Sequence, residues 1–360
     1  RRFDAANQEL TSTAIRVNRI MAAMMPVMML VMNFTTIAII WFGGIRIDNG
    51  EMQVGALMAF LQYAMQIMFS LLMVSILFVM IPRAFASAER IAQVLEIEPE
   101  IKDPDLATNP SDRRGYIEFR NVTFSYPGAE QPVLSDMSFT AKPGQVTAII
   151  GGTGSGKSTL VNLILRFYDV DSGSILVDGV DVRDQSQASL RTKIGFVPQK
   201  AILFTGTIAD NIRYGKKDAT DEEVSRAAEI AQATEFILGG KGGFDAEISQ
   251  GGTNLSGGQK QRLAIARALV RRPEIYIFDD SFSALDFKTD AKLRAALKEV
   301  TADSTVLIVA QRVSTVMDAD QIIVLDEGRI AGIGNHRQLL KDCKVYREIM
   351  ASQLAEGEIA

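Results

Sequence analysis

The fold of this sequence is decided by the stretch Gly151-Gly152-Thr153-Gly154-Ser155-Gly156-Lys157-Ser158-Thr159. It matches G-x-x-x-x-G-K-[ST] and follows an apolar, β-branched run, VTAII, at residues 146–150. Such a run predicts a buried strand, which gives the motif the strand–loop–helix context that a phosphate-binding loop requires. Its glycines let backbone N–H groups point at phosphates, and the following helix adds the positive end of its dipole. We expect Lys157 to reach the β- and γ-phosphates of ATP and Ser158 to ligate Mg²⁺.

A second predicted strand, at residues 275–278, ends in two carboxylates, Asp279 and Asp280. A carboxylate at the end of a strand beside a phosphate-binding loop can hold the hydration shell of Mg²⁺. The alternative is a carboxylate that only caps a loop. Because the loop needs a metal partner, we favour Asp279 as part of a magnesium site.

A second phosphate-binding helix end is predicted farther along the chain. A strongly patterned helical segment at residues 260–269 follows the run Leu255-Ser256-Gly257-Gly258-Gln259. Small residues at a helix N-terminus leave its N–H groups open to an anion. If both helix ends serve the same nucleotide, two copies of this domain must face each other.

Two long uncharged runs, residues 20–45 and 52–82, predict membrane spans. Each exceeds the roughly 20 apolar residues that cross a bilayer, and helices buried in a soluble core rarely run so far without charge. A turn signal, Asp48-Asn49-Gly50, separates them. Under the positive-inside rule both ends are cytoplasmic, because arginines flank the pair on its outer sides at Arg1, Arg2, Arg16, Arg19, Arg83 and Arg90.

The second span carries a polar stripe of Gln62, Gln66 and Ser70, spaced four apart on one helix face. Polar groups in a bilayer normally face protein or a water-filled cavity, so the stripe indicates either a substrate cavity or helix–helix packing. Twelve of the 15 methionines lie in the two runs. Methionine suits surfaces that accept varied apolar ligands, and it suits lipid contact equally well.

Composition divides the chain into three parts: a transmembrane portion at 1–95, a proline-spaced linker at 96–114, and a soluble domain at 115–355. The linker contains Pro99, Pro104 and Pro110, and a helix is expected to run through residues 85–95 before it. The net charge of −5, without a Lys/Arg-rich run, argues against a nucleic-acid partner. One cysteine and one histidine exclude a disulfide within the chain and a cysteine- or histidine-rich metal site.

Taken together, these motifs resemble those of ABC (ATP-binding cassette) exporter subunits, whose signature is LSGGQ. The resemblance covers nearly the whole chain. It implies a transmembrane α-helical hairpin, the last two of six helices, followed by an α/β P-loop NTPase cassette with a helical subdomain. We therefore expect the chain to be the C-terminal fragment of a half-transporter.

The resemblance also assigns roles to residues outside the phosphate-binding loop. Tyr126 matches the aromatic residue that stacks on adenine, and Gln199 matches the Q-loop glutamine that touches Mg²⁺. Glu247 matches the segment that contacts coupling helices. Asp286 closes the D-loop, Ser283-Ala284-Leu285-Asp286.

Two positions depart from the family pattern, and both concern catalysis. Asp280 stands where the family usually has the Glu that acts as general base, and its carboxylate is drawn back by ~1 Å. Gln311, after the strand predicted at residues 305–310, stands where the family usually has His, and an amide neither titrates near neutral pH nor carries positive charge. Both changes in one site predict firm ATP binding with poor hydrolysis, as in one half of an asymmetric heterodimer.

The implied function is ATP-driven export of hydrophobic compounds, multidrug or lipid-like, with ATP and Mg²⁺ as cofactors. The expected partners are a second half-transporter and membrane lipids. The expected location is the bacterial plasma membrane, multi-pass, with a cytoplasmic cassette. The alternatives are a mainly regulatory ATP-binding subunit and a lipid or peptide exporter of the same architecture. The uncharged runs argue against a soluble ABC ATPase acting on DNA or ribosomes.

Overall fold

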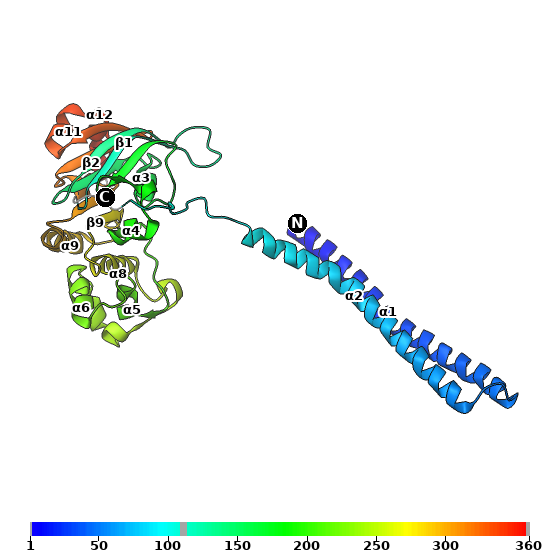
Figure 1. Cartoon of the computed structure of the whole chain (residues 1–360). Coiled ribbons are helices and arrows are strands. Elements are labelled where there is room, and N and C mark those ends of the chain that lie inside the picture. Colours follow the sequence, from blue (N-terminus) through cyan, green and yellow to red (C-terminus); the bar gives the residue numbers. More distant parts are fainter. Residues whose placement is uncertain (1, 109–113, 358–360) are drawn as a thin grey trace. The chain divides into compact units, whose positions relative to one another are not determined.

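A computed structural model describes residues 2–108 and 114–357 and divides the chain into two compact units. One is a pair of helices that ends at Pro99, and the other is a cassette that begins at Glu100 (Figure 1). Arg1 and part of the predicted linker, including Asn109 and Pro110, lie outside the described residues.

The helical unit consists of α1 (Arg2–Asp48) and α2 (Val54–Leu95), which lie side by side (Figure 1). At 1.5 Å per residue they are about 70 and about 63 Å long, whereas the hydrocarbon core of a bilayer is about 30 Å thick. Both are long and apolar enough to cross a membrane. The first predicted span lies within α1, and the second lies within α2 except for Met52 and Gln53, which precede the helix. The helix expected at residues 85–95 is confirmed as the end of α2.

Close packing joins α1 to α2, and the polar stripe lies away from that contact. A Cβ atom added to Gly43 would stand 2.3 Å from Leu57 Cδ1, so glycine permits the helices to approach. Gln62, Gln66 and Ser70 are exposed, and the Ser70 hydroxyl donates to the Gln66 carbonyl of its own helix. The stripe is therefore free to face a cavity or further helices.

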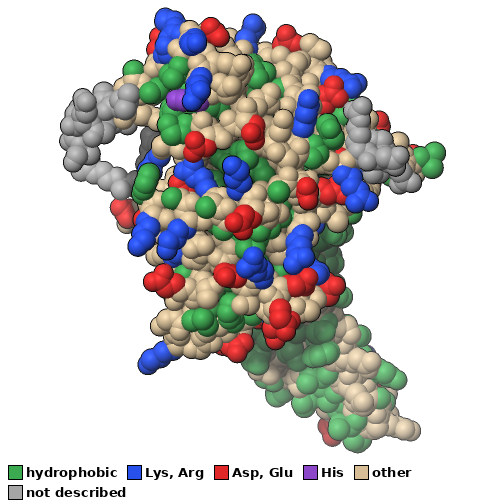
Figure 2. Space-filling view, turned by 90° about the vertical axis from the view of Figure 1, so that its left-hand side faces the viewer, with side chains coloured by type: hydrophobic (Ala, Val, Ile, Leu, Met, Phe, Trp, Pro, Cys, Tyr) green, Lys and Arg blue, Asp and Glu red, His purple; other side chains and the backbone are tan. Residues whose placement is uncertain are grey.

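The exposed surfaces of the two units differ in chemistry. Large apolar side chains are exposed along the whole of α1 and α2, among them Phe34, Trp41 and Phe78. Such continuous apolar exposure is typical of a surface that meets lipid or another protein. The cassette face in Figure 2 instead shows acidic and basic side chains interspersed, as on a surface that meets water.

The described residues of the cassette form three sheets. An antiparallel sheet has the order β2-β1-β4-β5, a larger sheet has the order β12-β11-β3-β10-β9-β6, and β7 pairs with β8. In the larger sheet β11, β3, β10, β9 and β6 are parallel, and only β12 is antiparallel. The strands are β1 (Ile117–Phe124), β2 (Leu134–Ala141), β3 (Val146–Gly151), β4 (Ser172–Val177), β5 (Val180–Asp181), β6 (Ile194–Val197), β7 (Gly206–Thr207), β8 (Glu247–Ile248), β9 (Ile275–Asp279), β10 (Thr305–Ala310), β11 (Gln321–Asp326) and β12 (Arg329–Gly334).

Helices surround the sheets, and α5, α6 and α8 gather into a helical part at one end of the cassette (Figure 1). The α-helices are α3 (Lys157–Ile164), α4 (Gln187–Thr192), α5 (Ile208–Arg213), α6 (Asp221–Ile230), α7 (Thr234–Gly239), α8 (Gly257–Leu269), α9 (Phe287–Val300), α10 (Val313–Val316), α11 (His336–Asp342) and α12 (Lys344–Gly357). Three 3₁₀ turns accompany them: η1 (Val182–Asp184), η2 (Gly243–Asp245) and η3 (Gln250–Gly252).

The parallel sheet is buried on both faces, which confirms the apolar runs predicted as strands. Along β3, Ala148 and Ile150 pack into one hydrophobic cluster while Ile149 packs into the other. Strands covered on both sides read as continuous apolar runs because neither face meets water. The carboxyl ends of β3, β9 and β10 consequently lie side by side, which is where nucleotide sites form in open α/β sheets.

The middle of the predicted linker packs onto the cassette. Asp103 Oδ1 accepts a hydrogen bond from the Gln187 amide at 2.9 Å, which lowers the pKa of that carboxyl. The Lys102 carbonyl accepts one from Arg166 Nη2 at 3.1 Å. The cassette unit accordingly begins at Glu100, ahead of the boundary predicted at residue 115.

Candidate functional site

The loop between β3 and α3 needs glycine at two positions for steric reasons. Gly156 precedes α3 with φ of 94°, and a Cβ there would stand 2.5 Å from Leu134 Cδ2. A Cβ on Gly151 would stand 2.3 Å from the Leu325 carbonyl of the neighbouring strand. Glycine alone adopts such a left-handed conformation without strain and allows such a close approach. Glycine at these two positions therefore permits the tight path of the loop between the strand and the helix.

Lys157 lies across this loop and is only 9% exposed. Its Nζ donates to the carbonyls of Gly151 at 2.9 Å and of Gly152 at 2.7 Å. Burial lowers the pKa of the ammonium, and the nearby charges of Asp280 and Asp279 act in the opposite direction. A buried cation flanked by N–H donors is a suitable partner for a phosphate chain.

Ser158 and Asp279 form the part of the site that fits a magnesium ion. Asp279 ends β9 and is 7% exposed; burial raises the pKa of its carboxyl, and a hydrogen bond with Ser158 lowers it. Hydroxyl and carboxylate oxygens are the ligand types that Mg²⁺ prefers. Among the described residues no cluster of three or more His, Cys, Asp or Glu could hold a metal. An ion here would need oxygens from phosphate and water, as is usual for Mg²⁺ in nucleotide sites.

The two predicted catalytic residues, Asp280 and Gln311, are in contact, and Gln199 of the predicted metal site joins them. Asp280 Oδ2 accepts hydrogen bonds from Gln199 Nε2 at 3.2 Å and from Gln311 Nε2 at 3.3 Å. The backbone of Asp280 has φ of 47°, and its N–H donates to the Val309 carbonyl at 2.9 Å. Burial raises the pKa of the Asp280 carboxyl, whereas the hydrogen bond from Gln199 lowers it. Asp280, which is one methylene shorter than the usual Glu, is thus held by the side-chain amides of Gln199 and Gln311.

These groups surround one cavity of about 400 Å³ beside the loop. Its lining includes the predicted metal and catalytic residues and most of the predicted ATP-binding residues, but not Gly151, Gly152 or Ser155. It adds Val133 and Val309, which no sequence motif had indicated. The full lining is Tyr126, Val133, Thr153, Gly154, Gly156, Lys157, Ser158, Thr159, Gln199, Asp279, Asp280, Val309 and Gln311.

Tyr126, predicted to stack on adenine, lies at one side of this cavity. Its hydroxyl is 3.0 Å from Thr159 Oγ1, and its ring meets Phe124 and Tyr168 edge-on. Packing on two aromatic rings fixes the orientation of the tyrosine. A flat ligand next to the phosphate-binding loop would find a preformed aromatic wall.

The signature segment lies apart from this cavity, since none of its residues is in the lining. Ser256 caps α8 in a capping box with Gln259, and both Ser256 and Gly257 are exposed. A Cβ on Gly258 would stand 3.0 Å from the Ala284 carbonyl, so the D-loop packs directly on the start of α8. Within one cassette the two predicted phosphate sites therefore do not share one cavity.

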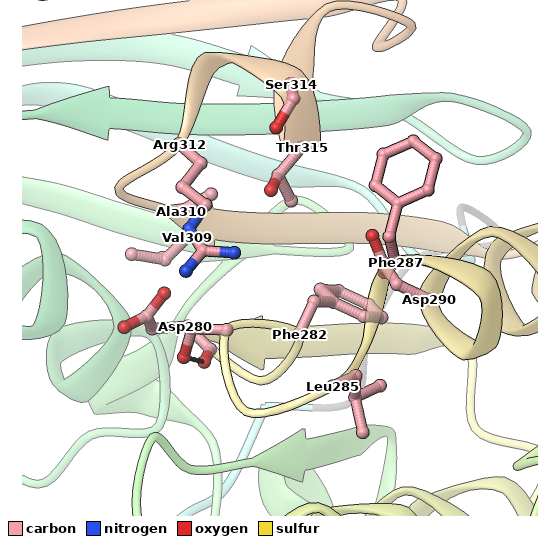
Figure 3. A pocket seen from close by; sticks show the side chains of 11 residues that line it. Asp280, Phe282, Leu285, Phe287, Asp290, Val309, Ala310, Arg312, Ser314 and Thr315 are labelled. Atoms are coloured by element: carbon pink, nitrogen blue, oxygen red, sulfur yellow. Dashed lines mark hydrogen bonds between the residues drawn. The ribbon is translucent and has the colours of Figure 1, made fainter. Parts of the chain in front are cut away.

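The D-loop and the segment after β10 enclose a smaller cavity of about 70 Å³ (Figure 3). Arg312 reaches into it toward Asp280, and the guanidinium charge lowers the pKa of that carboxyl. Asp286 does not enter the cavity; it caps α9 by accepting from the Thr289 N–H at 3.0 Å. Sequence reasoning missed Arg312, although its position next to Gln311 could have indicated it.

Comparisons with known proteins agree with this geometry. Two family models match, "ABC transporter" over residues 134–283 and "ABC transporter transmembrane region" over residues 1–71. A solved bacterial Atm1-family ABC exporter with ATP bound superposes with a TM-score of 0.80 at 35% identity, over 90% of this chain and 56% of that one.

Relatives of known sequence span both units. An uncharacterized ABC transporter ATP-binding protein of Mycobacterium tuberculosis is 49% identical over 356 residues, which are 98% of this chain and 61% of that protein. The fatty acid ABC transporter ATP-binding/permease protein of the same species is 37% identical over 349 residues, 97% of this chain and 55% of that protein. This chain therefore spans somewhat more than half the length of these relatives. With a transmembrane-region match at one end and an ATPase-cassette match at the other, it belongs to the ABC transporter family and has the fold of the ABC exporters.

Proposed function

We propose that this chain belongs to an ATP-driven exporter of hydrophobic compounds, in which α1 and α2 are the last two of six transmembrane helices. The matched transmembrane region, the apolar exposure of both helices and the likeness to a solved exporter support this. The arginine flanks favour a cytoplasmic cassette at a bacterial plasma membrane. The relative that bears the name of a fatty acid transporter favours lipid-like substrates over other hydrophobic compounds.

The chain's own nucleotide site binds Mg²⁺-ATP and hydrolyses it slowly. The observation that carries this proposal is the convergence of Gln199 and Gln311 on Asp280 Oδ2. A general base must reach the attacking water, and a carboxylate that is one methylene short and tied to two amides is poorly placed to do so. Gln311 offers no positive charge to the γ-phosphate, so it stabilises the transition state less than an imidazolium would.

The exposed signature supports a second half-transporter as partner. Ser256 and Gly257 are exposed and lie outside the lining of the chain's own cavity, and the N-terminus of a helix such as α8 favours an anion. In a heterodimer these groups would complete the partner's site, where hydrolysis takes place. Two ATP molecules held between the cassettes would favour the closed dimer, and hydrolysis at the competent site would reset it.

Restoring the usual catalytic pair tests the weak-hydrolysis proposal. We expect Asp280→Glu combined with Gln311→His to raise turnover at this site by about 100-fold, the size of effect that ~1 Å of misplacement can have. The measurement is phosphate release by the purified heterodimer whose partner site has been inactivated. Asp326→Glu, an exposed change of the same chemistry at the end of β11, is the control. Unchanged turnover in the double variant would contradict the proposal.

The polar stripe on α2 supplies a test of the transport pathway. We propose that Gln62, Gln66 and Ser70 line the substrate cavity. Single cysteines at these positions should react with a water-soluble thiol reagent, and bound substrate should protect them. Cysteine at Ile67 or Leu71, exposed on another face of α2, is the control. Labelling at the controls alone would show that the stripe packs against protein.

The second candidate is a mainly regulatory subunit that binds ATP and never hydrolyses it. The amide-bound Asp280 is the observation that favours it. In that case the restored double variant would change transport without any turnover of its own. The phosphate-release measurement therefore separates the two candidates.

A further inference from the structure

One side chain of α12 bridges the backbone on both sides of Arg312. Gln353 Nε2 donates to the Gln311 carbonyl at 2.7 Å, and Gln353 Oε1 accepts from the Val313 N–H at 2.8 Å. A single amide thus makes two hydrogen bonds to the segment that carries Gln311. The same Gln311 donates to Asp280 with its side chain.

Gln353 supplies a hydrogen-bond acceptor to the N-terminus of α10, which has no capping side chain of its own. Val313 begins α10, and the residue before it, Arg312, makes no side-chain capping hydrogen bond. The first N–H groups of a helix have no partner within the helix, and a side-chain acceptor usually supplies one. Here the acceptor comes from a segment about forty residues farther along the chain. Its contact is therefore tertiary, and it positions the loop between β10 and α10.

The position of α12 is itself fixed by the core. Tyr346 is fully buried, and its hydroxyl is 2.8 Å from His336 Nδ1 of α11. Ile349 and Met350 pack against the larger hydrophobic cluster. Gln353 follows Tyr346 by about two turns and so lies on the same helix face. A cavity of about 580 Å³ brings Asp280, Gln311, Met350 and Gln353 together in one lining.

We propose that Gln353 is a positioning residue for the nucleotide site. It holds the backbone of Gln311, so that the Gln311 side chain reaches Asp280 and the place of the γ-phosphate. Through it, α12 sets how long the site retains ATP. This inference rests on the proposed function of the site as an ATP holder.

The test measures ATP retention and backbone protection in the purified heterodimer. Gln353→Met fills a similar space without hydrogen bonds, and Gln353→Ala removes the side chain. In both variants we expect hydrogen exchange of the Val313 amide to rise, and ATP to leave this chain's site about fivefold faster, the size of effect of one or two hydrogen bonds. Ser352→Ala, the exposed neighbour on the same helix, should change neither.

A double-mutant cycle shows whether Gln353 acts through Gln311. In a Gln311→Ala background, Gln353→Met should no longer speed ATP release, because the side chain it positions is gone. Wild-type retention in Gln353→Met, unchanged exchange at Val313, or additive effects in the cycle would each overturn the proposal. The exchange measurement does not depend on hydrolysis, so failure here is distinct from failure of the Asp280→Glu/Gln311→His experiment.

Discussion

The N-termini of α3 and α8 offer the same chemistry in opposite settings. At α3 no side chain caps the helix, and Lys157, Ser158 and two carboxylates surround its open N–H groups. At α8 the Ser256–Gln259 capping box occupies part of the helix end, and the surface around it is exposed. The N-terminus of α3 thus combines, within one protein chain, the N–H donors, the cation and the metal-binding oxygens that the phosphates of ATP need. The N-terminus of α8 has donors only, so in the proposed heterodimer it would act on the nucleotide of the other cassette.

The largest expected effect is at the α3 end. Lys157→Met keeps the apolar stem and removes the ammonium, and we expect ATP to bind this chain about 100-fold more weakly, because hydrogen bonds to charged groups contribute about 1.5–3 kcal/mol each. Titration with a fluorescent ATP analogue measures the loss. Lys241→Met, an exposed lysine far along the chain, is the control. A loss of less than about threefold would mean that the loop binds phosphate without this lysine.

The α8 end should show the reverse pattern. A side chain at Gly257 meets open space, so Gly257→Asp leaves the fold intact and places a negative charge at the helix end. We expect ATP binding by this chain to stay unchanged while turnover of the heterodimer falls about tenfold, because the new carboxylate repels the partner's nucleotide. Gly239→Asp, which also has open space, is the matched control. Equal losses of binding and turnover would contradict the separation of the two sites.

The smallest expected effect concerns stability without nucleotide. Burial raises the pKa of Asp279, so ionisation of this carboxyl opposes folding, and its stabilising contribution is lost as pH rises through the raised pKa. Asp279→Asn should raise the unfolding temperature of the nucleotide-free protein at neutral pH by about 2–4 °C. The difference should shrink as pH falls, and Mg²⁺-ATP should stabilise the variant less. Calorimetry from neutral to acidic pH, with Asp326→Asn as an exposed control, checks the sign of the change in unfolding temperature.

Local sequence patterns predicted most of the strands and helices and most of the nucleotide site. The run at residues 146–150, the glycine loop and the helix after it appear in the expected order, because strand, turn and helix here follow from neighbouring residues. The pairing of β3 with β10 and β11 joins segments more than 150 residues apart, and local propensity contains no information on that order.

The contacts of Gln199 and Gln311 with Asp280 could not be predicted from the sequence. Gln199 and Gln311 were each predicted near the nucleotide, yet nothing in the sequence showed that both bind the same oxygen of Asp280. Gln353 had no motif at all, since its role depends on where α12 packs. The left-handed backbone of Asp280 was also invisible, although aspartate is among the residues that tolerate it best.

The unbroken lengths of α1 and α2 have a mechanical consequence. A helix about 70 Å long is more than twice as long as the bilayer core is thick, so in the proposed exporter it would act as a lever arm. If such an arm tilts by about 5° about one end, the other end moves by about 6 Å. A displacement of that size is comparable to the diameter of a lipid chain, so length alone can turn a slight rocking motion into a change of access.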